Sequence, residues 1–351
     1  MNKVWLYLVV LCTIFVAAGC DNSKTKKNYD IKKYNVAIIK TPKTSSLKGD
    51  TKIEYYDSNL RKVAEKAYSY GGVGRTNFGL PFKKGNDIYE LSIGYGIDKR
   101  DCKVLRLSME TGEMKEYGVC KYTNNIYVDD KYIYGIANLN GDTTISKTSI
   151  KDNKKNEVVV KKDICTECCK LGTDVYRLGD WENGKIFLKQ VKFNESKSRE
   201  KKIELTEYID EDTEPVSYYD YKDKMYIPTK DGLLCVHENK VNHIKLKILE
   251  DTNPELLRAV GNQLYIAVCS FLGENNHSLI VKYNMDTDQI ETEYEIESSI
   301  VQFDVVKNNL YVLNFDNELI KYRFDSDKIF EKKRIMLTEQ EDEYVSAMFA
   351  K

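Results

Sequence analysis

The chain has 351 residues, and its 54 Lys and Arg residues nearly balance its 55 Asp and Glu residues. This balance argues against a nucleic-acid partner or an anionic membrane surface, because both attract strongly basic proteins. Tyr is abundant, at 26 residues, whereas Pro is scarce, at 5. Since tyrosine and β-branched residues favour strands, this composition predicts an all-β protein.

The first residues have the pattern of a secretory signal peptide. Lys3 supplies a positive charge, residues 4–16 are mostly apolar, and small residues at 17–19 precede Cys20. A charged start, a short apolar run and small residues before a cleavage site define such signals. The run is shorter than the roughly 20 apolar residues of a transmembrane helix. We therefore predict that residues 1–19 are a signal peptide.

Cys20 directly follows Ala17-Ala18-Gly19 and thereby resembles the cysteine of the bacterial lipobox, although Ala17 stands where that family prefers leucine. The resemblance implies that Cys20 is lipidated with a diacylglyceryl group, becomes the mature N-terminus and anchors the chain to the membrane. It also implies a location on the outer face of the bacterial cytoplasmic membrane, on the periplasmic side if the host has an outer membrane. An ordinary cleaved signal or a signal-anchor is the alternative. Residues 20–33 are then the lipidated cysteine and a polar tether, and residues 34–351 form one folded domain.

A phrase of a turn residue, an apolar residue, an aromatic residue and a further apolar run recurs along the domain. Its aligned aromatic residues, in steps of 45, 53, 39, 39 and 46 residues, are Tyr89, Tyr134, Phe187, Tyr226, Tyr265 and Tyr311. Short strands between turns at a period of about 40–50 residues are typical of β-propeller blades. A second phrase, an acidic or polar turn, is expected to join the third and fourth strands of blades. It occurs at 56–59, 109–112, 285–288 and 324–327.

The two ends of the domain predict one further blade. Strands are expected at 35–39, 51–56 and 61–68, one short of four, and the segment 344–350 supplies one isolated strand. A ring closed by both termini leaves no free sheet edge at its seam. We therefore predict an all-β, seven-bladed β-propeller. Six or eight blades are the alternatives, because the blade at about 170–210 is irregular.

Cys102 and Cys120 are the best candidates for a disulfide among the seven cysteines that follow Cys20. Disulfides form and persist outside the cytoplasm. The two residues are centred on Thr111 in a predicted turn, so in a regular hairpin they would face each other at a distance that a disulfide spans. Buried thiols at apolar positions are the alternative.

Cys165, Cys168 and Cys169 form an unusual cluster, for which a structural disulfide is predicted. Half of a zinc or copper site is an alternative, but the sequence has no second Cys-x-x-Cys pair, so no metal is expected. The adjacent pair also resembles the cofactor-stacking element of pyrroloquinoline-quinone dehydrogenases. Those propellers use recurrent tryptophans, whereas Trp181 is the one tryptophan after the signal. Cys235 and Cys269 are expected to be buried core thiols.

The periodicity over 34–351 resembles that of bacterial quinoprotein-like and related seven-bladed propellers, which implies a fold and not an activity. The glycine-rich run 71–74 lacks the Lys-Ser/Thr and the helix of a phosphate-binding loop. No cofactor is expected, and no catalytic residue is assigned.

The leading hypothesis is therefore a cell-surface binding or scaffold lipoprotein without catalytic activity. Its ligand would be a protein, peptide or glycan at one face of the ring. The alternative is an extracytoplasmic lyase, hydrolase or quinone-dependent dehydrogenase, because catalytic residues from distant blades need leave no short motif. A third hypothesis is an assembly or sensory role, in which the side of the ring meets a membrane complex.

Overall fold

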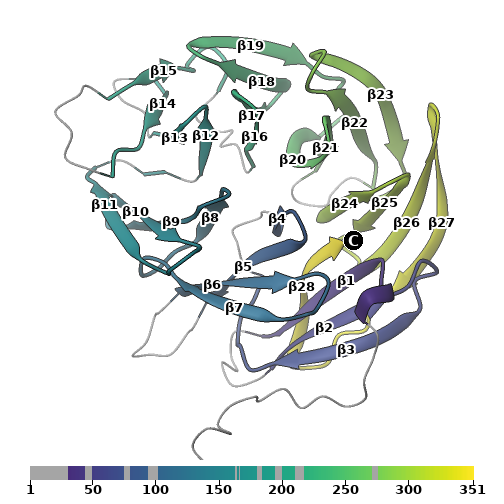
Figure 1. Ribbon diagram of the computed structural model, residues 1–351. Coiled ribbons are helices and arrows are strands. Elements are labelled where there is room, and N and C mark those ends of the chain that lie inside the picture. Colours follow the sequence, from purple (N-terminus) through teal and green to yellow (C-terminus); the bar gives the residue numbers. More distant parts are fainter. Residues whose placement is uncertain are drawn as a thin grey trace, which may run out of the picture.

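The structure is a computed structural model that describes residues 31–43, 50–74, 80–93, 102–162, 164–165, 167–179, 184–193, 200–209, 217–270 and 276–351. In these ranges, 28 strands form seven four-stranded antiparallel sheets that surround a common centre (Figure 1). A short 3-10 helix, η1 (Ile31–Lys33), precedes the first strand. The predicted seven-bladed β-propeller is confirmed, and the alternatives of six or eight blades are wrong.

Each blade runs from an inner strand to an outer strand, and the inner strands of most neighbouring blades contact one another. Blade 1 contains β28 (Glu343–Ala350), β1 (Val36–Pro42), β2 (Thr51–Tyr56) and β3 (Lys62–Tyr68). Blades 2 and 3 contain β4 (Phe82–Lys84), β5 (Asp87–Ile93), β6 (Cys102–Ser108) and β7 (Met114–Gly118), then β8 (Asn125–Val128), β9 (Tyr132–Leu139), β10 (Asp142–Ser149) and β11 (Lys155–Val160).

The remaining four blades follow in chain order. Blades 4 and 5 contain β12 (Cys168–Leu171), β13 (Asp174–Leu178), β14 (Phe187–Gln190) and β15 (Lys202–Glu204), then β16 (Tyr219–Tyr221), β17 (Lys224–Thr229), β18 (Gly232–His237) and β19 (Lys240–Lys245). Blades 6 and 7 contain β20 (Asn253–Val260), β21 (Gln263–Cys269), β22 (Ser278–Asn284) and β23 (Gln289–Ile296), then β24 (Gln302–Val306), β25 (Asn309–Leu313), β26 (Glu318–Asp325) and β27 (Lys328–Met336).

The ring is closed by strands from both ends of the chain. β28 pairs antiparallel with β1, with Met348 opposite Ile38, and the C-terminus lies near the centre of the ring in Figure 1. Met348 and Phe349 are fully buried. The predicted closure is therefore confirmed, and β1 has hydrogen-bonded neighbours on both sides.

The repeated aromatic residue lies on the second strand of its blade in five of the six predicted cases. In each of them it pairs with the first-strand residue seven positions earlier, as Tyr89 pairs with Phe82. The assignment of Phe187 is wrong, because Phe187 begins the third strand β14. Tyr176 on β13, which pairs with Cys169, holds the equivalent position. A turn followed by an aromatic residue can precede any strand of a hairpin, so the phrase alone could not distinguish the two.

The four polar turns join third and fourth strands, as predicted, because they connect β2 to β3, β6 to β7, β22 to β23 and β26 to β27. In the first of them, Oδ1 of Asp57 accepts hydrogen bonds from the backbone N–H groups of Asn59 and Arg61, at 2.8 and 2.9 Å. Such bonds satisfy the turn backbone and explain why acidic residues recur there.

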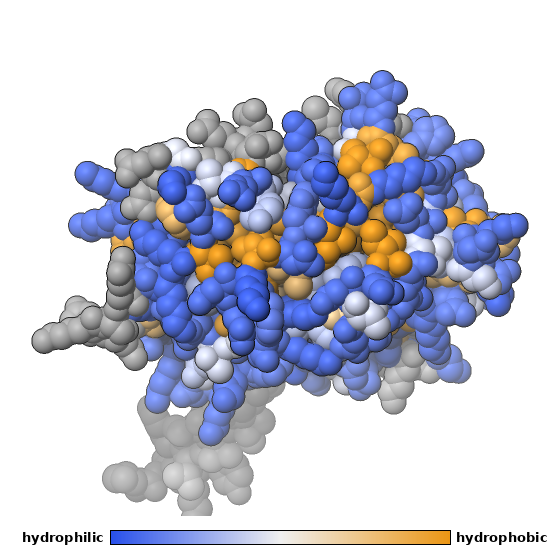
Figure 2. Space-filling view, turned by 90° about the horizontal axis from the view of Figure 1, so that it is seen from above, coloured by the Kyte–Doolittle hydropathy of each residue, from blue (hydrophilic) through white to orange (hydrophobic). Residues whose placement is uncertain are grey.

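One side of the outer surface of the ring is mainly polar. Figure 2 views the side of the ring that lies at the top of Figure 1, and shows hydrophilic residues over most of it with apolar areas between them. Among the described residues, no helix has the length and the apolar character needed to cross a membrane. The predicted signal peptide and Cys20 lie outside the described residues.

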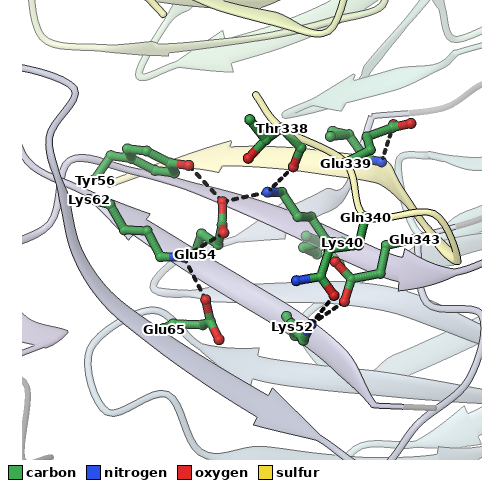
Figure 3. Close-up of polar contacts among 12 residues, drawn as sticks. Lys40, Lys52, Glu54, Tyr56, Lys62, Glu65, Thr338, Glu339, Gln340 and Glu343 are labelled. Carbon is green, nitrogen blue, oxygen red and sulfur yellow. Dashed lines mark hydrogen bonds and ion pairs between the residues drawn. The ribbon is translucent and has the colours of Figure 1, made fainter. Parts of the chain in front are cut away.

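A polar cluster holds the closing blade together (Figure 3). Nζ of the buried Lys40 lies 2.9 Å from Oε2 of Glu54 and donates a hydrogen bond of 2.7 Å to the carbonyl oxygen of Thr338. Glu54 also accepts hydrogen bonds of 2.6 Å from Oη of Tyr56 and from Nζ of Lys62. Although burial raises the pKa of Glu54, these hydrogen bonds lower it below its ordinary value. The cluster therefore ties the segment before β28 to β1 and β2.

We expect Lys40→Met to lower the free energy of unfolding by about 1–3 kcal/mol, because it removes one of the hydrogen-bond partners of the buried carboxylate of Glu54. Lys62→Met removes the other cation, whose side chain is 41% exposed, and should change the free energy by less than about 1 kcal/mol. Urea denaturation of both variants measures the difference. Equal losses would contradict the role assigned to the buried lysine.

Candidate functional site

The inner strands of five neighbouring blades surround a cavity of about 290 Å³ at the centre of the ring. Its wall combines aromatic and apolar side chains with cations and polar groups, including Phe82, Lys83, Tyr127, Glu167, Tyr219 and Arg258. Gly85, in the turn after β4, lines the cavity and is exposed, so the cavity reaches the surface at this end.

One repeated register position supplies four side chains of this wall, those of Phe82, Tyr127, Tyr219 and Arg258. The first-strand residue opposite the second-strand aromatic is Phe82, Tyr127, Cys169 and Tyr219 in blades 2 to 5. In blades 6 and 7 the same position holds Arg258 and Asp304. This position has no formal charge in blades 2 to 5, but it carries a positive charge in blade 6 and a negative charge in blade 7.

Asp304 lies at the centre of a buried charge network. Its Oδ1 is 3.6 Å from Nε of Arg258, and its Oδ2 is 3.2 Å from Nζ of Lys83. Lys83 also donates a hydrogen bond of 2.7 Å to the carbonyl oxygen of Ala350, and Asp304 accepts one of 2.8 Å from the Ala350 N–H. One carboxylate is therefore shared between two cations and also holds the last strand of the ring.

Two donor atoms of Arg258, Nε and Nη2, have no hydrogen-bond partner in the described part of the chain. Its Nη1 donates a hydrogen bond of 2.8 Å to the carbonyl oxygen of Pro81, whereas its Nη2 has no hydrogen-bond partner among the described residues. The residue is 7% exposed. Burial lowers the pKa of Arg258, yet a guanidinium stays charged in proteins. An unsatisfied buried donor costs about 1–3 kcal/mol.

Two buried carboxyl groups accompany this network. Glu90 on β5 is 3% exposed, and neither of its carboxyl oxygens has a hydrogen-bond partner among the described residues. Glu167 lines the cavity and accepts a hydrogen bond from the side-chain amide of Asn125. Burial raises the pKa of each to about 8, although the charge of Arg258 opposes this at Glu90. Both carboxyl groups are therefore mainly protonated and neutral at pH 7.

We expect these two groups to make the protein less stable as the pH rises from about 4.5 to about 8. An unperturbed Glu loses its proton near pH 4.5, whereas the folded protein keeps both protons until about pH 8. The unfolded state binds fewer protons in this window, so the free energy of unfolding falls with rising pH. Glu90→Gln removes one titration and should be more stable than the parent protein at pH 8 by about 1–3 kcal/mol.

Urea denaturation at pH 5 and pH 8 tests this expectation. Between these two pH values, the folded protein keeps the Glu90 proton that the unfolded chain has largely lost, so most of the change in the free energy of unfolding falls there. Glu113→Gln changes an exposed glutamate and serves as the control. If the Glu90→Gln profile ran parallel to that of the parent protein, Glu90 would not be the protonated group that we describe.

The register expected for Cys102 and Cys120 is wrong by one residue. Lys103 pairs with Gly118, so Val119 and not Cys120 continues the hairpin opposite Cys102. Both cysteines are buried and approach the same residue, with Sγ of Cys102 at 3.5 Å from the carbonyl oxygen of Thr123 and Sγ of Cys120 at 3.1 Å from its Oγ1. The described residues contain no disulfide bond, and the pairing of these two cysteines stays a prediction.

Cys165, Cys168 and Cys169 are all buried at the start of blade 4. Sγ of Cys165 donates a hydrogen bond of 3.0 Å to the carbonyl oxygen of Glu167. Burial raises the pKa of the Cys168 and Cys169 thiols well above the usual range, so both keep their protons. No group of three or more His, Cys, Asp or Glu side chains within the described ranges is placed to hold a metal. The geometry gives no support to the metal-site alternative.

The other features noted in the sequence have structural places. Cys235 on β18 and Cys269 on β21 are buried, as expected of core thiols. Gly74, in the connection between blades 1 and 2, has a positive φ of 84° and lies against Ser346 of β28, which explains a glycine at this position. Trp181 lies outside the described residues.

Neither Arg258 nor Asp304 was predicted from the sequence as a site residue. A signal for both was present, because each stands seven residues before an aromatic of the repeat, Tyr265 or Tyr311. Glu90 has a weaker signal: it directly follows the aromatic Tyr89, where three of the equivalent residues, Ile227, Ile266 and Val312, are apolar, although Arg177 is not.

The chain matches no protein-family model and no curated protein sequence. It is similar in structure to a candidate 6-phosphogluconolactonase from Bacteroides uniformis, with a TM-score of 0.59 and 11% identity over 90% of this chain and 99% of that chain. A protein from Lactobacillus plantarum gives a TM-score of 0.56 and 10% identity over 90% and 99% of the two chains. An acylaminoacyl peptidase from Pyrococcus horikoshii gives 0.52 and 11%, with 91% of this chain matching 52% of that chain. At such identities the similarity concerns the fold alone.

Proposed function

We propose that this protein is a lipid-anchored binding protein on the outer face of a bacterial cytoplasmic membrane. Its ring would bind a protein, peptide or glycan at the face onto which the central cavity opens, and one terminal group of the ligand would enter the cavity. The observation that carries the proposal is the central cavity itself, which the inner strands of five blades line with aromatic, apolar and charged side chains, Arg258 among them.

The size and lining of the cavity support this function. At about 290 Å³, it is at the lower end of the range for small-molecule pockets, about 300–1,000 Å³. Its apolar and aromatic wall with few polar groups is the usual composition of such pockets. A cavity of this size suits one residue or one sugar better than an extended chain.

The binding function is tested with arrays of peptides and glycans, probed with the full chain carrying Cys20→Ser. Ala259→Phe enlarges a side chain that lines the cavity and should weaken binding of any hit by at least about tenfold, or about 1.4 kcal/mol. Ser69→Phe changes an exposed residue outside the cavity and should leave binding unchanged. Hits that bind Ala259→Phe as tightly as the parent would contradict the proposed site.

The anchor is tested by labelling bacteria with radioactive palmitate. The parent chain should incorporate label and stay in the membrane fraction, whereas Cys20→Ala should lose the label. Cys12→Ala changes the other cysteine of the signal region and should keep it. Label retained by Cys20→Ala would remove the lipid anchor from the proposal.

An enzyme is the second candidate, and Glu167 is the observation that favours it. This carboxyl group lines the cavity, and burial raises its pKa to about 8, so it can donate a proton near neutral pH. Incubation of the array hits with the protein, followed by mass spectrometry, separates the two candidates. Conversion of a ligand by the parent but not by Glu167→Gln would establish catalysis, and recovery of unchanged ligand would leave binding.

A further inference from the structure

The central cavity opens on the face of the ring at which the described chain begins. Gly85 lines the cavity, and the next residue, Asn86, accepts a hydrogen bond of 2.9 Å at its carbonyl oxygen from the Met109 N–H. The turn that starts at Met109 ends at Gly112, and Cδ1 of Ile31 lies 3.1 Å from the position that a Cβ on Gly112 would take. Two neighbouring turns of blade 2 thus connect the mouth of the cavity to Ile31.

Ile31 is fixed at this face by its packing. It is the first residue of η1 (Ile31–Lys33), and its side chain packs against a core cluster that includes Tyr55 and Tyr68. Oη of Tyr68 donates a hydrogen bond of 2.7 Å to the carbonyl oxygen of Gly112, which holds the turn against blade 1. The chain that precedes Ile31 therefore joins the ring on the face of the cavity mouth.

The distance to the predicted lipid anchor is short. Cys20 precedes Ile31 by 11 positions, and a chain of that length reaches at most about 40 Å. The opposite face of the ring lies farther away by the length of a strand, about 26 Å for the eight residues of β9. To turn that face to the membrane, the tether would have to run along the outside of the ring almost fully extended, which costs conformational entropy. An anchor at Cys20 therefore favours a cavity mouth that faces the membrane.

The face around the mouth has charges that offset one another. Its turns contain the ion pairs Arg61–Asp57 and Lys84–Asp130, at 2.8 and 3.0 Å. An anionic lipid surface attracts clusters of Lys and Arg whose charge is not offset, so these turns give the face no strong attraction to the bilayer. The ring would then stand off the membrane by the length of its tether. A lipid headgroup stays at the bilayer surface, whereas a segment of a membrane protein can project across this gap.

On these grounds, and resting on the proposed lipid-anchored binding function, we infer that the cavity faces the membrane and binds a projecting peptide segment of a neighbouring membrane protein. An apolar side chain of that segment would pack against Leu80, Phe82 and Leu257, which line the cavity. The narrow gap between the ring and the bilayer would keep folded soluble proteins from the mouth.

The orientation is tested with the lipidated protein in vesicles that carry rhodamine-labelled headgroups. The described cysteines are all buried, so fluorescein maleimide labels an introduced one. Lys131→Cys places the dye next to Asp130 at the mouth, and Lys161→Cys places it after β11 at the opposite face; both lysines are exposed. The length of blade 3, about 26 Å, separates the two positions, so energy transfer should be at least about twofold more efficient from position 131.

A longer tether is the matched control. Insertion of about 30 Gly and Ser residues after Asn28 lets the ring turn freely and should remove most of the difference between the two dyes. Equal transfer from both positions in the parent chain, or more transfer from position 161, would overturn the inferred orientation. A protein that did not stay on the vesicles would disprove the anchor of the proposed function, and this inference with it.

An antibody that binds and quenches fluorescein tests the source of the ligand. On vesicles, the dye at position 131 should be quenched at least about tenfold more slowly than the dye at position 161. In the soluble chain with Cys20→Ser the two rates should be equal. Equal rates on vesicles would show that soluble proteins reach the mouth, and a ligand from the membrane would be wrong although the proposed binding function would stand. Array hits that were glycans alone would overturn the peptide segment.

Discussion

A chain that ends after Leu337 is expected not to fold cooperatively. It lacks β28, which forms seven residue pairs with β1, and it exposes both faces of the seam. Met348 and Phe349 are fully buried, and each such side chain contributes about 1.5–3 kcal/mol. These losses, added to those of the pairing, approach the total stability of a typical domain, about 5–15 kcal/mol.

Circular dichroism melts and size-exclusion chromatography measure the effect of the truncation. A sharp thermal transition should be replaced by a broad one, and the elution volume should indicate an expanded or aggregated chain. A matched control removes residues 21–30, the polar tether expected from the sequence, and should melt like the parent. A truncated chain that retained the parent's melting temperature would show that the ring does not need its last strand.

Asp304→Asn should lower the free energy of unfolding by about 3–5 kcal/mol, the usual effect of breaking a buried ion pair. The change removes the negative charge beside Arg258 and Lys83, and it weakens the acceptor of the Ala350 N–H. The effect should therefore reach the ring closure as well as the cavity. Hydrogen exchange of the backbone N–H groups of β28 should accelerate more in this variant than that of β23.

The control for Asp304→Asn is Asp174→Asn. Asp174 pairs with Lys201 at 2.9 Å, but the lysine side chain is 62% exposed, so we expect a loss below about 1 kcal/mol in urea denaturation. Similar losses from the two variants would contradict the importance of burial at Asp304. Unchanged exchange in β28 would contradict its link to the ring closure.

The repeat explains why much of the fold could be predicted from local patterns. The expected strand at 51–56 coincides with β2 (Thr51–Tyr56), and the segment 344–350 became β28 (Glu343–Ala350). Apart from β28 in blade 1, each blade is a local meander, so turns and alternating apolar residues within about 50 residues are enough to define it. The exception is blade 4, where Phe187 was assigned to the wrong strand.

The candidate site could not be predicted in the same way, because its residues are far apart in the sequence. Lys83 and Asp304 are 221 positions apart, and neither belongs to a short motif. Cys102 and Cys120 show the opposite difficulty: they are close in sequence, yet Cys120 lies beyond the end of β7 (Met114–Gly118). A shift of one residue in a hairpin changes which side chains face each other.

The sequence by itself predicted the blades and favoured seven of them over six or eight, because the period of turns and aromatic residues records contacts within each four-stranded sheet. It also predicted that the first and last strands meet, since each end of the domain held an incomplete blade. Only the tertiary structure placed Arg258, Asp304 and Lys83 around one cavity and left Nη2 of Arg258 without a hydrogen-bond partner among the described residues. Closure of the ring brings the inner strands together, and the burial that follows gives these side chains properties that no local pattern records.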